Sequence, residues 1–342
     1  MQEFLQSLGC CAARVFSDRL LFRAGTLLGV AGWMLVPAVS VAQTPQTTLR
    51  VEQVNPQSHP FEQFQCGQST LQVRNLGQAL EIVFKGESRM LLPAVAASGA
   101  RYQAPGDPET EFWGKGPRAT VTWSGQQLPT CVMPGAVALP FKASGNEPFW
   151  SITYDGWVLT LQQPGRSPLV RDASISESSP AGFLLDAGKA LQMRVRSNQC
   201  VDTMTGMTYP ETVSLDYEGQ QLQGCGGDPL RLLQGAQWQV LRMTGKAFSD
   251  DQAAWLSFLP ENRLAGNSGC NRFMGSYQLS AEGLSLQGLA GTRMACSPQQ
   301  MTTESRLLNL LAQVRGFSIA SDGTLVLKTD DDASAIELSQ EQ

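Results

Sequence analysis

The residue types that carry most enzyme chemistry are scarce in this chain. Its 342 residues include one histidine, His59, which removes most Ser-His-Asp, Cys-His and histidine-rich metal designs. Glu147 and Asp202 could act as an acid–base pair, although such carboxylates more often cap turns. Three adjacent aspartates at 330–332 could attract calcium but are also typical of a solvated turn. The pattern points away from an enzyme and predicts no metal or cofactor.

The cysteines could form disulfide bonds. Cys10 and Cys11 lie in the N-terminal segment, and six others follow: Cys66, Cys131, Cys200, Cys225, Cys270 and Cys296. Six cysteines allow fifteen pairings, but pairing in chain order places one bridge in each of three segments. A metal cluster is the alternative, yet the chain has no C-x-x-C pair and no histidine near these cysteines. An even number in an exported chain favours three structural disulfides.

The N-terminal segment has the pattern of an export signal. Three arginines precede an uncharged, mostly apolar stretch over 24–36, and small residues then lead to Ser40-Val41-Ala42. A basic region, a short apolar region and an S-x-A end are typical of a secretory signal peptide. The apolar run is shorter than the roughly 20 residues that span a bilayer, so cleavage after Ala42 is favoured over an uncleaved anchor. We expect a periplasmic or secreted protein with no stable membrane span after cleavage.

Composition and charge exclude other broad classes. Hydrophobic residues make up 42% of the chain and charged residues 16%, which is typical of a globular chain. A formal net charge of −5 argues against a nucleic-acid binder, which needs a broad basic face. Residues 60–134 are balanced, with six basic and six acidic side chains, so the acidity lies further along the chain.

The length indicates two or three domains, and stretches rich in proline and small residues mark their limits. Residues 43–59 form a loose leader, a linker lies near 133–140, and a weaker break lies near 226–229. The predicted organisation is a signal peptide over 1–42, the leader over 43–59, and domains over 60–134, 141–232 and 233–342.

Short alternating runs of apolar and polar residues indicate a mainly β protein. They lie at 70–73, 80–84, 119–123, 157–161, 284–286 and 324–327. Turns rich in Gly, Asp and Asn separate these runs, as in small barrels or sandwiches.

One helix is predicted in the third segment. Ser297 is a good N-cap, Pro298 suits the first helical position, and Gln300 completes a capping box. Four apolar residues follow at helical spacing: Leu307, Leu308, Leu311 and Val314. Gly316 is suited to closing the C-terminal end. The third segment is therefore predicted to be α+β.

The first segment resembles a known family at several points in order. Ser98-Gly99-Ala100-Arg101-Tyr102 is followed by Trp113-Gly114-Lys115-Gly116, and Cys66 and Cys131 flank both. An S-G-x-x-Y loop, an aromatic residue followed by K-G, and flanking cysteines resemble the MliC/PliC family, bacterial inhibitors of c-type lysozyme, over residues 60–133. The resemblance implies a small antiparallel β-barrel whose ends the two cysteines join. Taken singly, each motif is also an ordinary turn.

The resemblance implies a set of partner-binding residues. In that family the serine of S-G-x-x-Y and the lysine of K-G enter the lysozyme cleft. The cleft presents one protonated and one ionised carboxyl group, to which a hydroxyl and an ammonium can both donate. The implied lysozyme-binding residues are Ser98, Gly99, Tyr102, Lys115 and Gly116. Gly99 would let the loop turn tightly, and Tyr102 would pack under the loop or hydrogen-bond it. Gly114 stands where the family usually has a hydroxyl residue, which predicts a looser lysine loop.

The second segment resembles an uncharacterised exported β-domain. The resemblance rests on Gly145-Asn146-Glu147-Pro148-Phe149-Trp150 and on the residues around Cys200 and Cys225. Trp150 and Trp157 are predicted to be core residues, and a sugar-facing platform is the alternative.

The third segment resembles the META (HslJ-like) family, which is linked to heat-shock and envelope-stress settings. The resemblance rests on Gly269-Cys270-Asn271-Arg272-Phe273 and Thr292-Arg293-Met294-Ala295-Cys296. Asn267 and Asn271 suit positive-φ turn positions. Asn267-Ser268-Gly269 could form a ligand-binding nest, although turn chemistry is the default.

Together these features predict a mainly β protein with a small antiparallel barrel, a β-rich middle domain and an α+β META-type domain. The leading hypothesis is a periplasmic or secreted inhibitor of c-type lysozyme, which is not an enzyme. The alternative is an envelope-stress binding or scaffold protein, in which the META and middle domains carry the function. A cell-wall glycan enzyme ranks third. Changes at Ser98 should disturb function if the protein is a lysozyme inhibitor, and changes near Asn271 if it is a binding module. Changes at Glu147 or Asp202 should abolish turnover if it is an enzyme.

Overall fold

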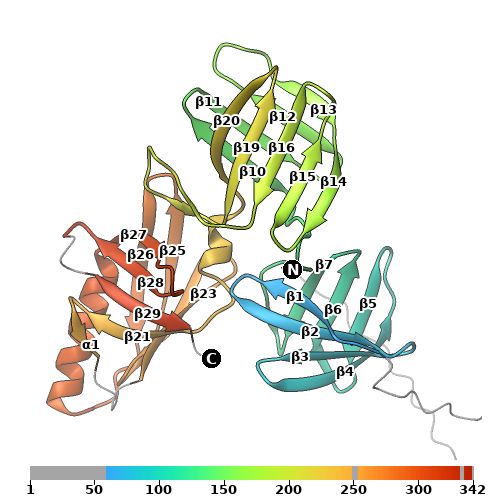
Figure 1. Cartoon of the computed structure of the whole chain (residues 1–342). Coiled ribbons are helices and arrows are strands. Elements are labelled where there is room, and N and C mark those ends of the chain that lie inside the picture. Colours follow the sequence, from blue (N-terminus) through green and yellow to red (C-terminus); the bar gives the residue numbers. More distant parts are fainter. Residues whose placement is uncertain (1–58, 249–252, 332–334, 341–342) are drawn as a thin grey trace, which may run out of the picture. The chain divides into compact units, whose positions relative to one another are not determined.

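The computed structural model describes residues 59–248, 253–331 and 335–340. The predicted signal peptide over 1–42 and all of the leader except His59 lie outside these residues. The described part is built from β-strands with a single α-helix (Figure 1), which confirms the predicted fold class. Within it, no helix combines the length and apolar character needed to cross a membrane.

The first sheet closes on itself as an antiparallel barrel. Its strands are β1 (Glu62–Cys66), β2 (Ser69–Asn75), β3 (Leu80–Phe84), β4 (Glu87–Ala94), β5 (Ala100–Ala104), β6 (Asp107–Lys115), β7 (Arg118–Trp123), β8 (Gln126–Gln127) and β9 (Cys131–Val132). β1 to β6 pair in sequence order, β6 pairs with β7, and β9 bridges β7 to β1. The predicted small barrel is therefore present.

Alternation along each strand builds the core of this barrel. On β3, Leu80, Ile82 and Phe84 are buried while the residues between them are partly exposed. Phe64 meets Phe112 edge to face inside the barrel, with 5.7 Å between ring centroids, a geometry that aromatic pairs prefer. Cys66 lies opposite Cys131 in the β1–β9 ladder, so their disulfide fastens the first strand to the last.

The second sheet comes from the middle of the chain and is antiparallel throughout. In spatial order its strands are β13 (Leu169–Asp172), β12 (Val158–Gln162), β11 (Phe149–Tyr154), β10 (Phe141–Asn146), β20 (Gln220–Gly226), β19 (Glu211–Tyr217), β16 (Leu191–Arg196), β15 (Gly182–Asp186) and β14 (Ser174–Ser179). A separate ribbon pairs β17 (Cys200–Val201) with β18 (Thr208–Tyr209). The Cys200–Cys225 disulfide joins this ribbon to β20.

Two tryptophans in the second sheet and its turns, Trp150 and Trp157, have opposite environments. Trp150 is completely buried, as predicted, whereas Trp157 is 80% exposed. The prediction for Trp157 was wrong because of a local turn. Asp155 accepts hydrogen bonds from the backbone N–H groups of Trp157 and Val158, an Asx-type turn that puts Trp157 at the tip between β11 and β12.

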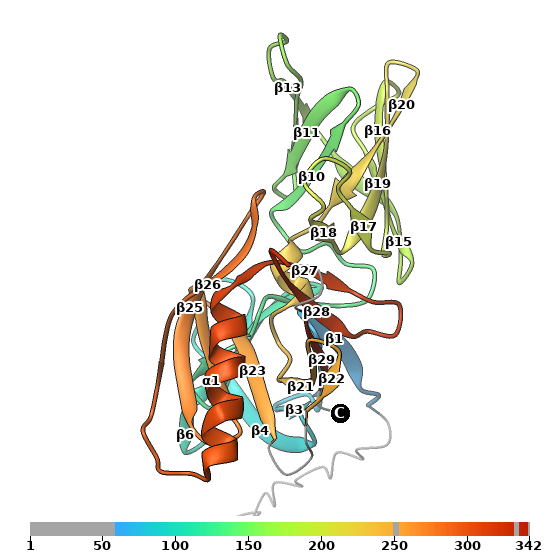
Figure 2. The same ribbon diagram turned by 90° about the vertical axis from the view of Figure 1, so that its left-hand side faces the viewer.

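The third sheet carries the α-helix. Its spatial order is β26 (Gly283–Gly291), β25 (Arg272–Ser280), β24 (Arg263–Ser268), β23 (Ala254–Leu259), β21 (Trp238–Met243), β29 (Ile336–Gln340), β28 (Leu325–Thr329) and β27 (Val314–Ile319), with β22 (Lys246–Ala247) paired to β21. A short 3₁₀ helix, η2 (Pro229–Leu232), precedes it. Helix α1 (Pro298–Ala312) packs on β24 and β26 (Figure 2).

The helix begins as predicted and ends earlier. The Ser297 side chain caps the Gln300 N–H, and the Gln300 side chain returns to the Ser297 backbone, which is the predicted capping box. The C-cap is Gln313, so the predicted end at Gly316 is wrong. Val314 and Gly316 both lie in β27, where Val314 is fully buried as a strand residue. β27 begins almost directly after α1. Val314 therefore continued the apolar spacing of the helix although it is the first residue of a strand.

The six cysteines are joined in chain order, as predicted. The pairs are Cys66–Cys131, Cys200–Cys225 and Cys270–Cys296. One disulfide therefore lies in each of the three sequence segments that build the large sheets.

Candidate functional site

Two connections at one end of the first barrel bring predicted site residues together. The serine loop (95–99) joins β4 to β5, and the lysine turn (115–117) joins β6 to β7. β5 and β6 are neighbours with Ala100 opposite Gly114, so both connections leave adjacent strands at the same end. Ser98 is exposed on the first connection, and the second begins at an exposed lysine.

Trp113 connects the two. It stands on β6 with Nε1 donating a hydrogen bond to the Ser98 carbonyl oxygen at 2.8 Å. The Lys115 Nζ lies 4.2 Å from the centroid of the Trp113 ring, within the range of a cation–π interaction. Trp113 contributed to the family motif but was not among the predicted site residues. The signal was present, since an aromatic residue two positions before the lysine shares its face of the strand.

The backbones of the two connections are also in close contact. Gly99 has a φ of +72°, and a Cβ built there would lie 2.5 Å from the Gly114 carbonyl oxygen and 2.9 Å from Lys115 Cγ. Only glycine fits both the left-handed backbone and the available space. The lysine turn was expected to be looser because Gly114 lacks a hydroxyl. The structure shows two features beside Lys115, the close approach of Gly99 and the Trp113 ring on its own strand.

The other end of the serine loop is held by an arginine on β5. Arg101 donates to both carboxylate oxygens of Glu111 on β6, at 2.8 Å from Nε and 2.6 Å from Nη2. Its Nη1 also reaches the Val95 carbonyl oxygen at 3.4 Å. The hydrogen bond and charge of Glu111 raise the pKa of Arg101, so this cation stays charged. Val95 itself is 93% exposed.

Tyr102 has a different position from the rest of the predicted set. It lies opposite Phe112 in the β5–β6 ladder, and it packs against the barrel core. The two roles predicted for Tyr102, packing beneath the loop or hydrogen-bonding it, stay predictions. Ser98, Gly99, Lys115 and Gly116 thus lie together at the barrel end, with Tyr102 on the inward side of the same strands.

The carboxylates considered for acid–base chemistry have different surroundings. Glu147 is exposed, whereas Asp202 is 8% exposed and its oxygens accept hydrogen bonds. Oδ1 accepts from the N–H groups of Met204 and Thr205 and from the Thr205 hydroxyl, and Oδ2 accepts from the Asn146 side chain at 3.0 Å. Asp202 therefore organises the turn between β17 and β18.

Hydrogen bonding also decides the ionisation of Asp202. Burial alone would raise its pKa, but the donors on Thr205, Asn146 and Met204 outweigh burial, and the pKa is lowered. The ionised form is the one this turn stabilises. A general acid at neutral pH would need the opposite shift.

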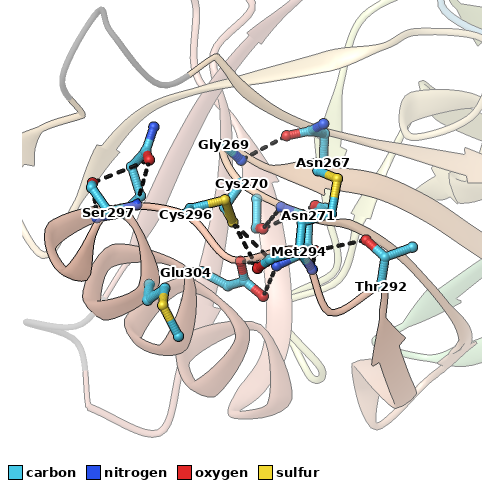
Figure 3. The surroundings of a disulfide bond; sticks show 12 residues. Asn267, Gly269, Cys270, Asn271, Thr292, Met294, Cys296, Ser297 and Glu304 are labelled. Carbon is cyan, nitrogen blue, oxygen red and sulfur yellow. Dashed lines mark hydrogen bonds between the residues drawn. A yellow bond between two sulfur atoms is a disulfide. The ribbon is translucent and has the colours of Figure 1, made fainter.

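In the third domain Asn271 lies inside a hydrogen-bonded network beside the Cys270–Cys296 disulfide (Figure 3). Its Oδ1 accepts from the Thr292 hydroxyl at 2.7 Å and the Met294 N–H at 2.8 Å. Its Nδ2 donates to the Glu304 carboxylate on α1 at 2.9 Å. These bonds connect the disulfide loop to the helix, and Asn271 itself is buried, at 5% exposure.

The predicted positive φ at Asn267 and Asn271 is wrong. Among the described residues, the non-glycine positions with positive φ do not include either asparagine, and Gly269 has the left-handed backbone with φ +94°. The Asn267 side chain instead accepts the Gly269 N–H at 2.7 Å. The segment 267–269 therefore forms a side-chain-capped turn.

In the part of the chain that the structure describes, no group of three His, Cys, Asp or Glu could hold a metal ion. Of the aspartates at 330–332, Asp330 pairs with Arg315 at 3.3 Å, and Asp332 lies outside the described residues.

Gly99→Ala tests the close contact between the two loops. The Ala side chain should clash with the Gly114 carbonyl, so we expect the variant to lose about 1–3 kcal/mol more stability than Gly116→Ala. Gly116 is the matched control, because it has a similar φ of +60° but open space around its Cβ position. Amide hydrogen exchange along β5 and β6 measures the difference. Equal losses in the two variants would show that the contact is not tight.

Asn271→Asp tests the network in the third domain. The substitution replaces the donor that faces Glu304 with a second carboxylate, and we expect a loss of at least about 2 kcal/mol at pH 7. Asn267→Asp is the control, since an aspartate can still accept the Gly269 N–H. Thermal unfolding and hydrogen exchange over 268–294 provide the measurement. A similar, small effect of both substitutions would contradict the network.

Asp202→Asn tests the lowered pKa. Because the folded-state pKa is lowered, ionised Asp202 stabilises the fold above its ordinary pKa, and that stabilisation is lost as pH falls through the lowered value. We expect the variant to be less stable than the parent by about 1–3 kcal/mol at pH 7, with the gap narrowing below about pH 4. Unfolding monitored against pH checks this, with Asp216→Asn, an exposed carboxylate on β19, as control. A gap independent of pH would rule out the linkage.

The chain was compared with known families and structures. Residues 64–129 match the family described as "Membrane-bound lysozyme-inhibitor of c-type lysozyme" (MliC), and residues 231–342 match the META domain. No curated protein matches the chain. An NMR structure of a protein from Burkholderia xenovorans is 26% identical, covers 33% of this chain and 86% of its own, and has a TM-score of 0.28. A second NMR structure is 27% identical, covers 31% and 90%, and has a TM-score of 0.27. The family matches confirm both predicted resemblances: this chain carries an MliC domain followed by a META domain.

Proposed function

We propose that this protein inhibits c-type lysozyme by inserting the serine loop and the lysine turn into the catalytic cleft. The family match over 64–129 supports an inhibitor role. The observation that carries the site assignment is the junction at Trp113, which holds Ser98 and Lys115 side by side at one end of a closed barrel. Two short exposed connections on a closed barrel are held on a rigid scaffold, which suits insertion into a cleft.

The chemistry of the two side chains fits the target. A glycosidase cleft presents a protonated carboxyl group and an ionised one. The Ser98 hydroxyl and the Lys115 ammonium are exposed donors, and hydrogen bonds to carboxylates in a water-excluded site are strong. The Ser98 carbonyl oxygen already accepts from Trp113, which restrains the backbone of this exposed residue.

The proposal extends to the organisation and setting of the chain. We place the inhibitor domain at 60–134, the β-rich domain at 141–232 and the META domain at 233–342, after a cleaved signal and a leader. Three disulfides favour an oxidising compartment, the periplasm or the cell exterior. The protein acts by occupying the enzyme's cleft, so it needs no reaction of its own and no cofactor.

Inhibition of a c-type lysozyme by residues 43–342 with the disulfides formed tests this function. We expect inhibition at submicromolar concentration, and Ser98→Ala and Lys115→Ala should each weaken it by about tenfold or more, equal to roughly 1.4 kcal/mol. Each substitution removes one donor to a cleft carboxyl group.

Ser124→Ala and Lys85→Ala are the matched controls, since both residues are exposed in turns at the opposite end of the same barrel. They should leave inhibition unchanged. An oxidised parent that fails to inhibit at high concentration would refute the proposed function. A parent that inhibits, with both site variants behaving like the controls, would move the inhibitory surface elsewhere.

A further inference from the structure

We propose that Trp113 is a positioning residue that locks the serine loop and the Lys115 ammonium into one binding-competent geometry. This inference rests on the proposed function and adds a residue that the motif itself does not assign. It concerns how the two donors are held before any partner arrives.

The position of Trp113 follows from the ladder. Phe112 points into the core and is 5% exposed, so the next residue on β6 must point outward. There Trp113 lies opposite Arg101 on β5 and Thr120 on β7. From this outward row the indole can reach both connections at the end of the barrel.

The serine loop has few other restraints. Val95, Ala97 and Ser98 are exposed, so burial contributes little to ordering the loop. Its backbone is held at two carbonyls, by Arg101 at Val95 and by the Trp113 indole at Ser98. The indole N–H is the shorter contact, at 2.8 Å against 3.4 Å. Removing it would leave the close packing of Gly99 against Gly114 to restrain the half of the loop that carries the hydroxyl.

The same ring restrains the lysine. A lysine ammonium sits on a flexible four-carbon stem and loses much freedom when it is fixed. With Nζ 4.2 Å from the ring centroid, the stem of Lys115 is already directed along the Trp113 face in the free protein. One side chain therefore orders both donors, and a preorganised binding surface loses less entropy on association.

The first arm of the test examines the free protein. NMR should show the Trp113 indole N–H protected from solvent exchange and the Lys115 Hε protons shifted upfield by the ring. Trp157, which is 80% exposed, is an internal reference for a freely exchanging indole. If the Trp113 indole exchanges as fast as that of Trp157, the lock does not exist and the proposal fails.

The second arm measures lysozyme inhibition and dissociation rate. Trp113→Phe keeps a ring for Lys115 but loses the bond to Ser98, and we expect a weakening of about tenfold through faster dissociation. Trp113→Leu loses both contacts and should weaken inhibition further. In the Trp113→Leu background, Ser98→Ala should have a smaller effect than in the parent, because the hydroxyl is no longer held in place.

Trp123→Phe is the matched control. Trp123 also has a cation over its ring, Arg89 at 5.3 Å, but it lies at the other end of β7 and should leave inhibition unchanged within about twofold. Hydrogen exchange of the β2 and β3 amides verifies that each variant keeps its barrel.

The outcomes separate this inference from the proposed function. Normal inhibition by both Trp113 variants, beside weakened Ser98→Ala and Lys115→Ala variants, would overturn the positioning role and leave the inhibitor function intact. If the parent does not inhibit lysozyme, the proposed function and the role of Trp113 in lysozyme binding are both refuted, whatever the indole exchange shows about the loop.

Discussion

The pairing of β5 with β6 is the constraint on which the candidate site depends. Its register sets Ala100 opposite Gly114 and Arg101 opposite Trp113. A slip of one residue would turn Trp113 toward the core and Phe112 toward solvent, since side chains alternate across a strand. Closure of the barrel through β9 and the Cys66–Cys131 disulfide opposes such a slip. The register therefore sets the two connections next to each other, and Trp113 contacts both of them.

Features with one clear local signal could be predicted from the sequence, whereas positions with two competing signals and side-chain contacts between distant residues could not. The capping box at Ser297 and Gln300 is local, and the sequence located it correctly. The end of the same helix was misplaced because Val314 satisfies both a helical spacing and a buried strand position in β27. Trp157 was misassigned because hydrophobicity outweighed the Asp155 turn that directs it outward.

The site shows the same division. Ser98 and Lys115 could be named from motifs, but the spacing between them says nothing about which atoms join the two loops. The bond from Trp113 to the Ser98 carbonyl spans fifteen positions and follows from the strand register. For Asn271, the residue type suggested a turn position. In the structure its side-chain amide accepts a hydrogen bond from Thr292 and donates one to Glu304 on α1, so it connects the disulfide loop to the helix.

The chain-order pairing of the cysteines has a consequence for biogenesis. A polypeptide that crosses a membrane from its N-terminus presents Cys66 and Cys131 before Cys200 has emerged, and Cys200 and Cys225 before Cys270. In a chain exported in this way, with Cys10 and Cys11 removed in the signal, each of the other six cysteines would meet its partner before the cysteines of the next bridge emerge. Oxidation could then follow translocation step by step, without a stage of disulfide reshuffling.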